Sequence, residues 1–307
     1  MGRLDNIEGI ERGKALGPLT TFGMGGPADY YYRVTDVMKI PALLEACAAD
    51  GLPYVLLGWG SNMVFSDKGF RGLVIHNLAK HIERDGELVV ADSGTLLSQI
   101  IQFSLKSGLT GMEKLIGVPG TIGGAVRGNA GAFGLEIRHI FEKALIYDSE
   151  TGVREVDADY LRFDYRHSRV KDSRELVLKV WLKLSPGDTE AGVAEVRKII
   201  ASRAGKHPTG KSAGSFFKNP SGNSVGVGLS AGLLIDQCGF KGTHRGGAFI
   251  SEKHGNFLMN DGSATMADVL ELSHEIQQAV QQKFSINLQR EVALVGEHGY
   301  LDDAPVK

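Results

Sequence analysis

GVPGTIGGAVRGNAGAFG, residues 117–134, places seven glycines in eighteen positions, against 41 in the 307 residues of the chain. Because glycine has no Cβ atom, such a run lets backbone N–H groups approach an anion closely, in turns that other residues avoid. A helix that begins after Thr121 would add the partial positive charge of its N-terminus. Apolar residues such as Val118 and Val126 between the glycines are not typical of a flexible linker. The run therefore predicts a rigid phosphate-binding loop packed against a core. The alternative is a tight, buried connection without a ligand.

Composition and charge are those of an ordinary globular chain. Its 307 residues, 42% of them apolar and 23% charged, are enough for about two domains. A net charge of −2 gives no reason to expect nucleic acid or an anionic membrane as a partner. The two cysteines, Cys47 and Cys238, cannot form a disulfide framework or a zinc site, so we expect no metal. The first seventeen residues lack the apolar core of a signal peptide, and no run approaches a membrane span, so a cytoplasmic protein is expected.

Hydrophobic periodicity predicts alternating helices and strands. Expected strands are residues 28–34, 54–57, 72–76, 87–92, 143–148, 175–184 and 286–295, and expected helices are 41–50, 96–106, 190–203 and 265–284. Thr95 is expected to cap the second helix, and Thr265 and Asp268 to form a capping box on the last. Alternation predicts a buried face in the strand at 175–184, formed by Leu176, Leu178, Val180, Leu182 and Leu184. Helical spacing predicts another in the helix at 190–203, formed by Val193, Val196, Ile199 and Ile200. We expect domains at 1–78, 79–200 and 201–307.

Two nucleotide-binding signatures occur by chance. Residues 205–212, GKHPTGKS, match the P-loop pattern, but a predicted helix precedes them and Asn219-Pro220 soon follows, so the required strand, loop and helix are missing. Residues 23–28, GMGGPA, match a dinucleotide fingerprint, but Pro27 and the strand after it prevent the required helix. The remaining anion-binding turns are 58–62 and 117–134. Together they would suit the pyrophosphate and adjoining parts of a dinucleotide such as FAD.

Several long motifs occur in one order along the chain: LGWGSNMVFSDKGFRG (57–72), GVPGTIGGAVRGNAGAFG (117–134), FDYRHS (163–168), GSFFKNP (214–220) and REVALVGE (290–297). On these, over about residues 17–297, the chain resembles the UDP-N-acetylenolpyruvoylglucosamine reductase family (MurB), within the p-cresol methylhydroxylase-like flavoproteins. The short spacing between Arg166 and Ser215 is that of the shorter, type II form. Trp59 departs from the family pattern, since a small or polar residue is common there, and the packing over the flavin is left open.

The resemblance implies a fold and an activity. The fold would be two α/β lobes that bind FAD, followed by an α+β substrate-binding domain from residue 201. The activity would be that of an oxidoreductase with non-covalent FAD, using NADPH to reduce UDP-N-acetylglucosamine enolpyruvate to UDP-N-acetylmuramate. That reaction belongs to peptidoglycan precursor synthesis, and so to cell wall biogenesis, cell shape and cell division. The expected partner is the small nucleotide-sugar substrate alone, with a monomeric protein.

Three catalytic residues carry over from the matching motifs. Arg166 would bind the substrate carboxylate, Ser215 would donate a proton opposite the flavin, and Glu291 would assist stabilisation or protonation. A guanidinium suits the first task because it stays charged and binds a carboxylate through two hydrogen bonds. Each residue also has an ordinary interpretation: Arg166 in a surface ion pair, Ser215 as a turn cap, and Glu291 paired with Arg290. Their joint presence in the motifs favours the catalytic interpretation.

Further binding residues follow by position in the motifs. Those expected at FAD are Gly58, Gly60, Ser61, Asn62, Val118, Pro119, Gly120, Thr121, Gly123, Gly124, Asn129, Gly131 and Arg203. Those expected at the substrate are Tyr165, Lys206, Lys218, Asn219 and His254. For His254 a hydrogen-bonded structural histidine is the alternative, and for Tyr165 a packed aromatic.

Three other functions are compatible with parts of the sequence. The flavoprotein fold also suits an oxygen-dependent oxidase of small alcohols. Residues 205–212 would serve an ATP-binding phosphotransferase if their context were different. A non-catalytic nucleotide-sugar binding protein would require only that Ser215 and Glu291 be structural.

Overall fold

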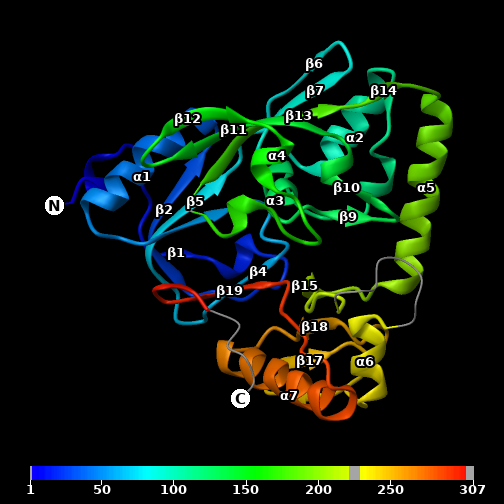
Figure 1. The fold of residues 1–307 in the computed structure, drawn as a ribbon. Helices are drawn as coiled ribbons and strands as arrows, with labels where there is room; N and C mark the ends of the chain where they lie inside the picture. Colours follow the sequence, from blue (N-terminus) through cyan, green and yellow to red (C-terminus); the bar gives the residue numbers. More distant parts are fainter. Residues whose placement is uncertain (1, 174, 221–228, 302–307) are drawn as a thin grey trace. The chain divides into compact units, whose positions relative to one another are not determined.

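The computed structural model describes residues 2–173, 175–220 and 229–301. These residues form a mixed α/β chain with two compact units (Figure 1). Unit 1 contains residues 1–10, 32–59 and 74–203, and unit 2 contains 11–31, 60–73 and 204–307. Each unit is therefore assembled from three separate stretches of the chain.

The main sheet of unit 1 has five strands in the order β12-β11-β13-β7-β6, all paired antiparallel. Its strands are β6 (Ile82–Asp85), β7 (Leu88–Asp92), β11 (Phe141–Asp148), β12 (Gly152–Val156) and β13 (Leu176–Lys183). Two short ladders accompany it: β8 (Leu109–Thr110) with β14 (Ser185–Pro186), and β9 (Gly131–Ala132) with β10 (Leu135–Glu136). The strands expected at 87–92, 143–148 and 175–184 are confirmed.

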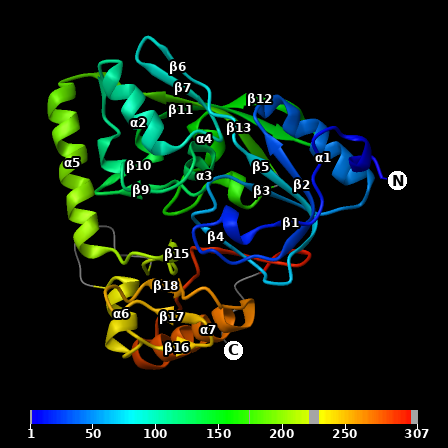
Figure 2. The same ribbon diagram turned by 180° about the vertical axis from the view of Figure 1, so that it is seen from behind.

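Three helices cover one face of this sheet, as the view from behind in Figure 2 also shows. They are α2 (Leu97–Lys106), α3 (Ile122–Arg127) and α4 (Ala158–Leu161). Their apolar sides meet the sheet in one buried core that includes Ile100, Val126 and Val180. The cap of α2 differs from expectation: Leu96 is the N-cap residue, while the Thr95 hydroxyl donates to the His81 carbonyl (3.4 Å). The chain reaches helical geometry one residue later than the sequence indicates.

A β-bulge interrupts the expected alternation in β13. Leu145 of β11 pairs with Lys179, but the next residue, Ile146, pairs with Val177. Leu178 is the extra residue on its strand and lies outside the buried core that contains Val177 and Val180. Because one inserted residue reverses which side chains face the core, the leucines of this strand do not share one face.

A second sheet has the order β1-β2-β5-β3. Its strands are β1 (Lys14–Ala15), β2 (Pro27–Val34), β3 (Tyr54–Leu57) and β5 (Phe70–Asn77), and α1 (Ile40–Ala49) connects β2 to β3. Along the chain, β2 and β5 each begin in unit 2 and end in unit 1. The expected strands 28–34, 54–57 and 72–76 and the helix 41–50 are confirmed.

Unit 2 contains a four-stranded antiparallel sheet in the order β15-β18-β17-β16. It consists of β15 (Lys211–Ser215), β16 (His244–Arg245), β17 (Ala248–Ile250) and β18 (Phe257–Asn260), with α6 (Ala231–Gln237) and α7 (Met266–Phe284) beside it. A smaller sheet, β20-β19-β4, joins β4 (Met63–Phe65), β19 (Ala293–Gly296) and β20 (Gly299–Tyr300). Of the strand expected at 286–295 only its last residues form β19, and an isolated bridge joins Arg290 to Phe217.

Helix α7 forms where the capping box predicts it. The Thr265 hydroxyl accepts from the Asp268 N–H (3.3 Å), and the Asp268 carboxylate accepts from the Thr265 N–H (2.8 Å). Val269, Leu272 and Ile276 then lie fully buried on one stripe against the core of unit 2.

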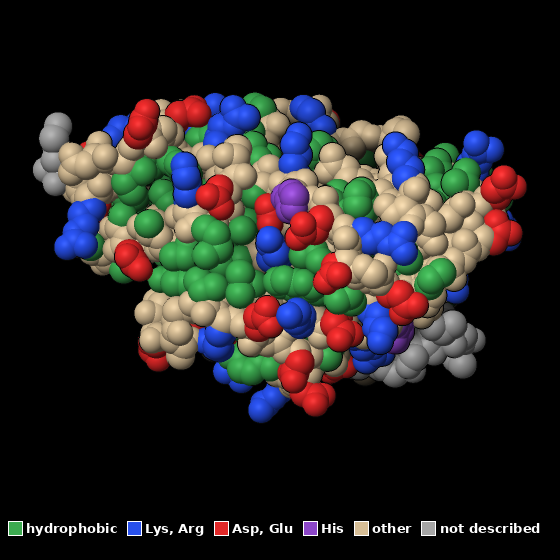
Figure 3. Space-filling model, turned by 90° about the horizontal axis from the view of Figure 1, so that it is seen from above, with side chains coloured by type: hydrophobic (Ala, Val, Ile, Leu, Met, Phe, Trp, Pro, Cys, Tyr) green, Lys and Arg blue, Asp and Glu red, His purple; other side chains and the backbone are tan. Residues whose placement is uncertain are grey.

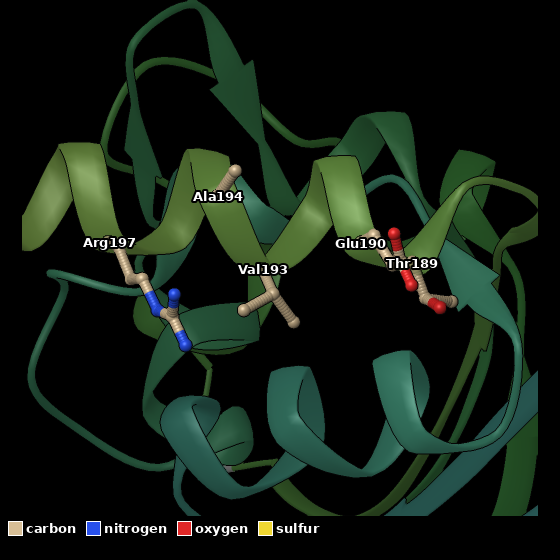
Figure 4. A pocket seen from close by; sticks show the side chains of 5 residues that line it. All are labelled: Thr189, Glu190, Val193, Ala194 and Arg197. Carbon is tan, nitrogen blue, oxygen red and sulfur yellow. The ribbon is translucent and has the colours of Figure 1, made fainter.

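The long helix α5 (Thr189–Lys206) buries less of its apolar side than expected. Val196 packs on the core of unit 1 and Ile199 is buried, but Val193 and Ile200 are 37% and 52% exposed. A hollow of about 320 Å³ lies along this helix, where Figure 4 shows Val193 and Arg197 on the same side. It is lined by Thr189, Glu190, Val193, Ala194 and Arg197, none of which is a predicted site residue.

The surface mixes charges of both signs. On the face in Figure 3, lysine and arginine side chains are mixed with aspartate and glutamate, and the largest group of apolar side chains lies left of the centre. No helix in the described part of the chain has the length and apolar character needed to cross a bilayer. Among the same residues, no cluster of three or more histidine, cysteine or acidic side chains has metal-binding geometry.

Candidate active site

The glycine run forms a loop and a short helix in unit 1. Thr121 is the N-cap of α3, and its hydroxyl accepts the Gly124 N–H (3.4 Å). The helix start expected after Thr121 is therefore confirmed.

The predicted anion-binding turn at 58–62 begins close to Thr121. A Cβ atom on Gly58 would lie 2.7 Å from the Thr121 hydroxyl oxygen, so only glycine allows the two segments to approach this closely. The exposed Trp59 and the 116–120 loop line a common hollow of about 220 Å³. Its lining is Trp59, Leu96, Ser98, Ile116, Gly117, Val118, Pro119 and Gly120. Of these, Leu96, Ser98 and Ile116 carried no signal in the sequence, because ordinary helix and core residues look the same there.

Several amides of the run are used by the protein itself. The N–H groups of Ile122 and Gly123 donate to the carbonyls of Thr95 (2.8 Å) and Ser93 (2.9 Å). A Cβ on Gly123 would lie 2.7 Å from the Ser93 Cβ, so this glycine lets α3 pack against the end of β7. The Val118 N–H likewise donates to the Leu115 carbonyl (2.9 Å). Part of the glycine content thus serves packing.

Arg203, near the end of α5, supplies positive charge to the glycine run. Its guanidinium donates to the Gly117 carbonyl and lies 5.6 Å from the centre of the Phe133 ring. Burial lowers the pKa of this guanidinium, because the charged form loses part of its hydration. A guanidinium held in this way favours the approach of an anion.

These features fit an FAD molecule. A dinucleotide phosphate bound here would meet the close approach at Gly58 and the partly buried cation Arg203, while the first three N–H groups of α3 are already bonded within the protein. Gly117, Gly120 and Trp59 at the hollow are the residues that would lie along it.

Gly58→Ala is expected to weaken FAD binding by about tenfold or more. The added methyl group would collide with the Thr121 hydroxyl and force the cap of α3 to move, at a cost of about 1–3 kcal/mol. Titration of the apoprotein with FAD, followed by flavin fluorescence, measures the change. Gly205→Ala is the control, since a Cβ there has no neighbour within 4 Å. Equal FAD affinity in Gly58→Ala and wild type would refute this account of the hollow.

Arg166 lies at the tip of a tight turn in unit 1. Asp164 and His167 exchange backbone hydrogen bonds (3.0 and 3.1 Å), so Tyr165 and Arg166 are the two central residues. Arg166 has a φ of +52°, which is costly for a residue with a side chain. Its guanidinium donates to the Gly131 carbonyl (2.9 Å) and lies 5.0 Å from the centre of the Tyr165 ring. The structure thus places Arg166, Tyr165 and Gly131 together.

A buried carboxylate anchors the segment that follows this turn. Glu175 is 4% exposed and contacts Arg154 (2.6 Å), Arg169 (3.4 Å) and the hydroxyls of Ser173 (2.8 Å) and Tyr160. Burial alone would raise the pKa of Glu175. The hydrogen bonds from Tyr160 and Ser173 and the two guanidinium charges outweigh burial and hold that pKa below its ordinary value of 4.5.

Removal of the Glu175 charge is expected to destabilise the protein. Glu175→Gln leaves two guanidinium groups facing an uncharged partner, and we expect a loss of about 3 kcal/mol in the free energy of unfolding. A lowered folded-state pKa contributes stability above the unfolded-state pKa, and this contribution is lost as the pH falls through the folded-state value. The difference between variant and wild type should therefore shrink in acid. Urea unfolding near neutral pH and below about pH 4 measures it.

Glu155→Gln, which removes an exposed pair with Lys143, should cost under about 1 kcal/mol. An equal cost for both variants would contradict this assignment.

Ser215 and Glu291 lie on neighbouring backbone segments of unit 2. Ser215 ends β15 with its side chain exposed, directly after Gly214, whose φ is +82°. The Glu291 N–H donates to the carbonyl of Phe216, the residue that follows Ser215 (2.8 Å). Asn62, predicted at FAD, donates to the Glu291 carbonyl (3.2 Å), and Gly60 and Ser61 precede it in the same unit. The structure therefore brings Ser215, Glu291 and Asn62 together.

A buried asparagine fixes the strand end that carries Ser215. Asn256 donates to the Phe217 carbonyl (2.8 Å) and accepts from the Phe217 N–H (2.9 Å). Sequence reasoning missed this residue, although a polar residue between apolar strand residues was the available signal. Because Phe217 is held at both backbone groups, the segment after Ser215 has one defined path.

The remaining predicted substrate residues belong to unit 2. The Lys218 N–H donates to the Gln289 carbonyl (2.9 Å), and the Asn219 side chain accepts from the Ala231 N–H (3.0 Å). His254 accepts the Asn256 N–H at Nδ1 (3.2 Å), and burial lowers the pKa of its ring. A hydrogen-bonded histidine is thus present at 254. Lys206 ends α5, and its side chain lies outside the described part of the chain.

Comparison with known proteins identifies two domains along the chain. Residues 28–157 match the family model of an FAD binding domain, and residues 206–295 match that of the UDP-N-acetylenolpyruvoylglucosamine reductase C-terminal domain. The chain is therefore an FAD-dependent oxidoreductase with an FAD binding domain and a C-terminal domain of the UDP-N-acetylenolpyruvoylglucosamine reductase type.

Full-length relatives define the family. The chain is 38% identical to the UDP-N-acetylenolpyruvoylglucosamine reductase of Clostridium novyi over 91% of its length and 89% of the relative's. It is also 38% identical to that of Syntrophus aciditrophicus, over 91% and 90%. The crystal structure of the Thermus caldophilus reductase superposes with a TM-score of 0.77 at 34% identity, covering 93% of this chain and 98% of that one. The chain belongs to the UDP-N-acetylenolpyruvoylglucosamine reductase family.

Proposed function

We propose that this chain reduces UDP-N-acetylglucosamine enolpyruvate to UDP-N-acetylmuramate with NADPH, as a cytoplasmic monomer in peptidoglycan precursor synthesis. In functional terms, FAD binding is assigned to residues 1–78 and 79–200, and substrate binding to 201–307. The observation that carries the proposal is Arg166. Its guanidinium is held on the glycine loop by the Gly131 carbonyl, and its backbone has a strained, left-handed conformation. Backbone strain of this kind is typical of a residue kept for chemistry rather than for stability.

Bound FAD would supply the redox chemistry, accepting a hydride from NADPH and giving one to the methylene carbon of the enolpyruvyl group. The electron pair of the carbon–carbon double bond then moves to the adjacent carbon and is shared with the carboxylate. Arg166 is assigned to bind that carboxylate and stabilise the added negative charge.

The second step is protonation of the same adjacent carbon. Ser215 is assigned as the donor: its O–H bond breaks, a C–H bond forms, and the saturated ether product results. Glu291, whose backbone is tied to Phe216, is assigned to support the serine and the developing charge. Hydride and proton together reduce the double bond, while NADPH is oxidised to NADP⁺.

Anaerobic absorbance spectroscopy tests the whole proposal. The flavin bands of the purified protein should bleach with NADPH and return with UDP-N-acetylglucosamine enolpyruvate. Bleaching without recovery would refute the substrate and leave the flavoprotein. Fast reoxidation of the reduced flavin by oxygen, without the enolpyruvyl substrate, would favour the oxidase alternative. UDP-sugar binding by a protein that takes up no flavin would favour a binding protein.

The phosphotransferase alternative has no support in the structure. Gly205 and Lys206 are the last residues of α5, and β15 begins at Lys211, so the P-loop pattern begins in the end of a helix and ends in a strand. This is the reverse of the arrangement that a P-loop needs.

A further inference from the structure

Asn129 is a fully buried polar residue directly after α3. Its side-chain NH₂ group has two hydrogens, and both are used: Nδ2 donates to Glu136 Oε2 (3.0 Å) and to the Asp164 carbonyl (2.9 Å). Its Oδ1 accepts the Arg138 N–H (3.1 Å). The amide of Asn129 is therefore occupied by the protein, whereas its sequence motif indicated a contact with FAD.

One of these bonds reaches the turn that carries Arg166. The Asp164 carbonyl accepts from Asn129 and also from the His167 N–H (3.1 Å), which closes the turn. A carbonyl oxygen has two lone pairs, and both are engaged here. Asn129 thus ties the base of the turn to the end of the glycine run, 35 positions earlier in the chain.

The segment that contains Asn129 also holds the side chain of Arg166. Gly131, two residues after Asn129, accepts a hydrogen bond from the Arg166 guanidinium (2.9 Å), while Lys171 donates to the Arg166 carbonyl (3.2 Å). A Cβ on Gly131 would lie 3.3 Å from Arg166 Nη1 and 2.7 Å from the Glu136 Cγ, so the contact is close packed. The backbone before Arg166 and its guanidinium are therefore both fixed to residues 129–131.

We propose that Asn129 is a positioning residue for Arg166. Its amide holds the Asp164 carbonyl, and so keeps Arg166 in a left-handed conformation (φ +52°) that the residue would otherwise leave. Without this bond the turn relaxes and the guanidinium takes up several orientations. A displacement of about 1 Å at a substrate-orienting group can lower a rate about a hundredfold. This inference rests on the role proposed for Arg166.

Asn129→Gly in the holoenzyme tests the inference. Glycine accepts the φ of +40° at this position without strain, so the variant removes only the side-chain amide. FAD affinity and the rate of flavin reduction by NADPH should stay within about twofold of wild type. The rate at which the enolpyruvyl substrate reoxidises the flavin should fall about ten- to a hundredfold.

Two further variants separate positioning from general damage. Asn129→Asp keeps an acceptor for the Arg138 N–H but sets a carboxylate oxygen against both the Asp164 carbonyl and the Glu136 carboxylate, so it should show the same selective loss. In an Arg166→Ala background, Asn129→Gly should lower the reoxidation rate by less than about twofold, because its partner is gone. Melting temperatures of all variants show whether each one folds.

The outcomes are distinct. A tenfold loss of FAD affinity in Asn129→Gly, with normal reoxidation of the loaded enzyme, would make Asn129 a cofactor ligand and overturn the inference. Multiplicative losses in the double variant would overturn it as well. A normal rate in Arg166→Ala alone would refute the proposed function of Arg166 and, with it, this inference. A slow Arg166→Ala beside a normal Asn129→Gly would refute the inference alone.

Discussion

Ser215→Ala is expected to accept hydride from NADPH at the wild-type rate and to pass it to the enolpyruvyl substrate about 10²–10⁴ times more slowly. The reason is that the variant loses only the proton donor, and positioned general acids contribute about this factor. The Ser215 side chain is exposed, and its removal breaks no described contact of the core. Stopped-flow absorbance of the flavin under anaerobic conditions measures the two half-reactions separately.

Two variants control for this result. Ser212→Ala, three residues earlier in β15, should leave both half-reactions within about twofold of wild type. Ser215→Cys retains an acidic hydrogen and should recover part of the lost rate. A Ser215→Ala enzyme with normal turnover would remove Ser215 from the mechanism.

Arg166→Gly is expected to be more stable than Arg166→Ala, although both lose turnover. At a φ of +52°, a residue with a Cβ atom costs about 1–2 kcal/mol and glycine almost nothing. Both variants lack the guanidinium, so we expect reoxidation by the enolpyruvyl substrate to fall about 10²–10³-fold. Urea unfolding gives the stability order, and the flavin half-reactions give the chemical loss.

A second arginine provides the matched control. Arg162, at the end of α4, also has a positive φ (+45°) but no assigned role. Arg162→Gly should gain a similar stability with unchanged turnover. If Arg166→Gly were less stable than Arg166→Ala, the left-handed backbone at this position would not carry the expected cost for a residue with a Cβ atom.

Local signals in the sequence predicted much of the fold. The helix start at Thr121 and the Thr265–Asp268 capping box depend on contacts between residues close in sequence, and both appear as predicted. Features that depend on distant partners were missed. The bulge at Leu178 arises from pairing with β11, and the exposure of Ile200 depends on what faces α5.

The candidate site shows the same division. The motifs predicted which segments form it, and the structure adds how they are held. No propensity indicates that Arg166 adopts a left-handed backbone, since arginine seldom does. Likewise, Asn129 and Asn256 resemble ordinary polar residues until the carbonyls of Asp164 and Phe217 are in place. Whether the individual residues contact FAD or substrate stays a prediction.

Unit 2 has a consequence for synthesis on the ribosome. Asn260 donates to the Phe22 carbonyl (2.9 Å), and Thr21 donates to the Ser212 carbonyl (2.7 Å), so an early segment completes the core formed by the last third of the chain. Residues 11–31 leave the ribosome long before those partners exist. Their apolar side chains, Phe22 among them, must stay unpaired until translation is nearly finished. A fragment that begins at residue 204 would lack them altogether, so the C-terminal domain is not expected to fold as an excised piece.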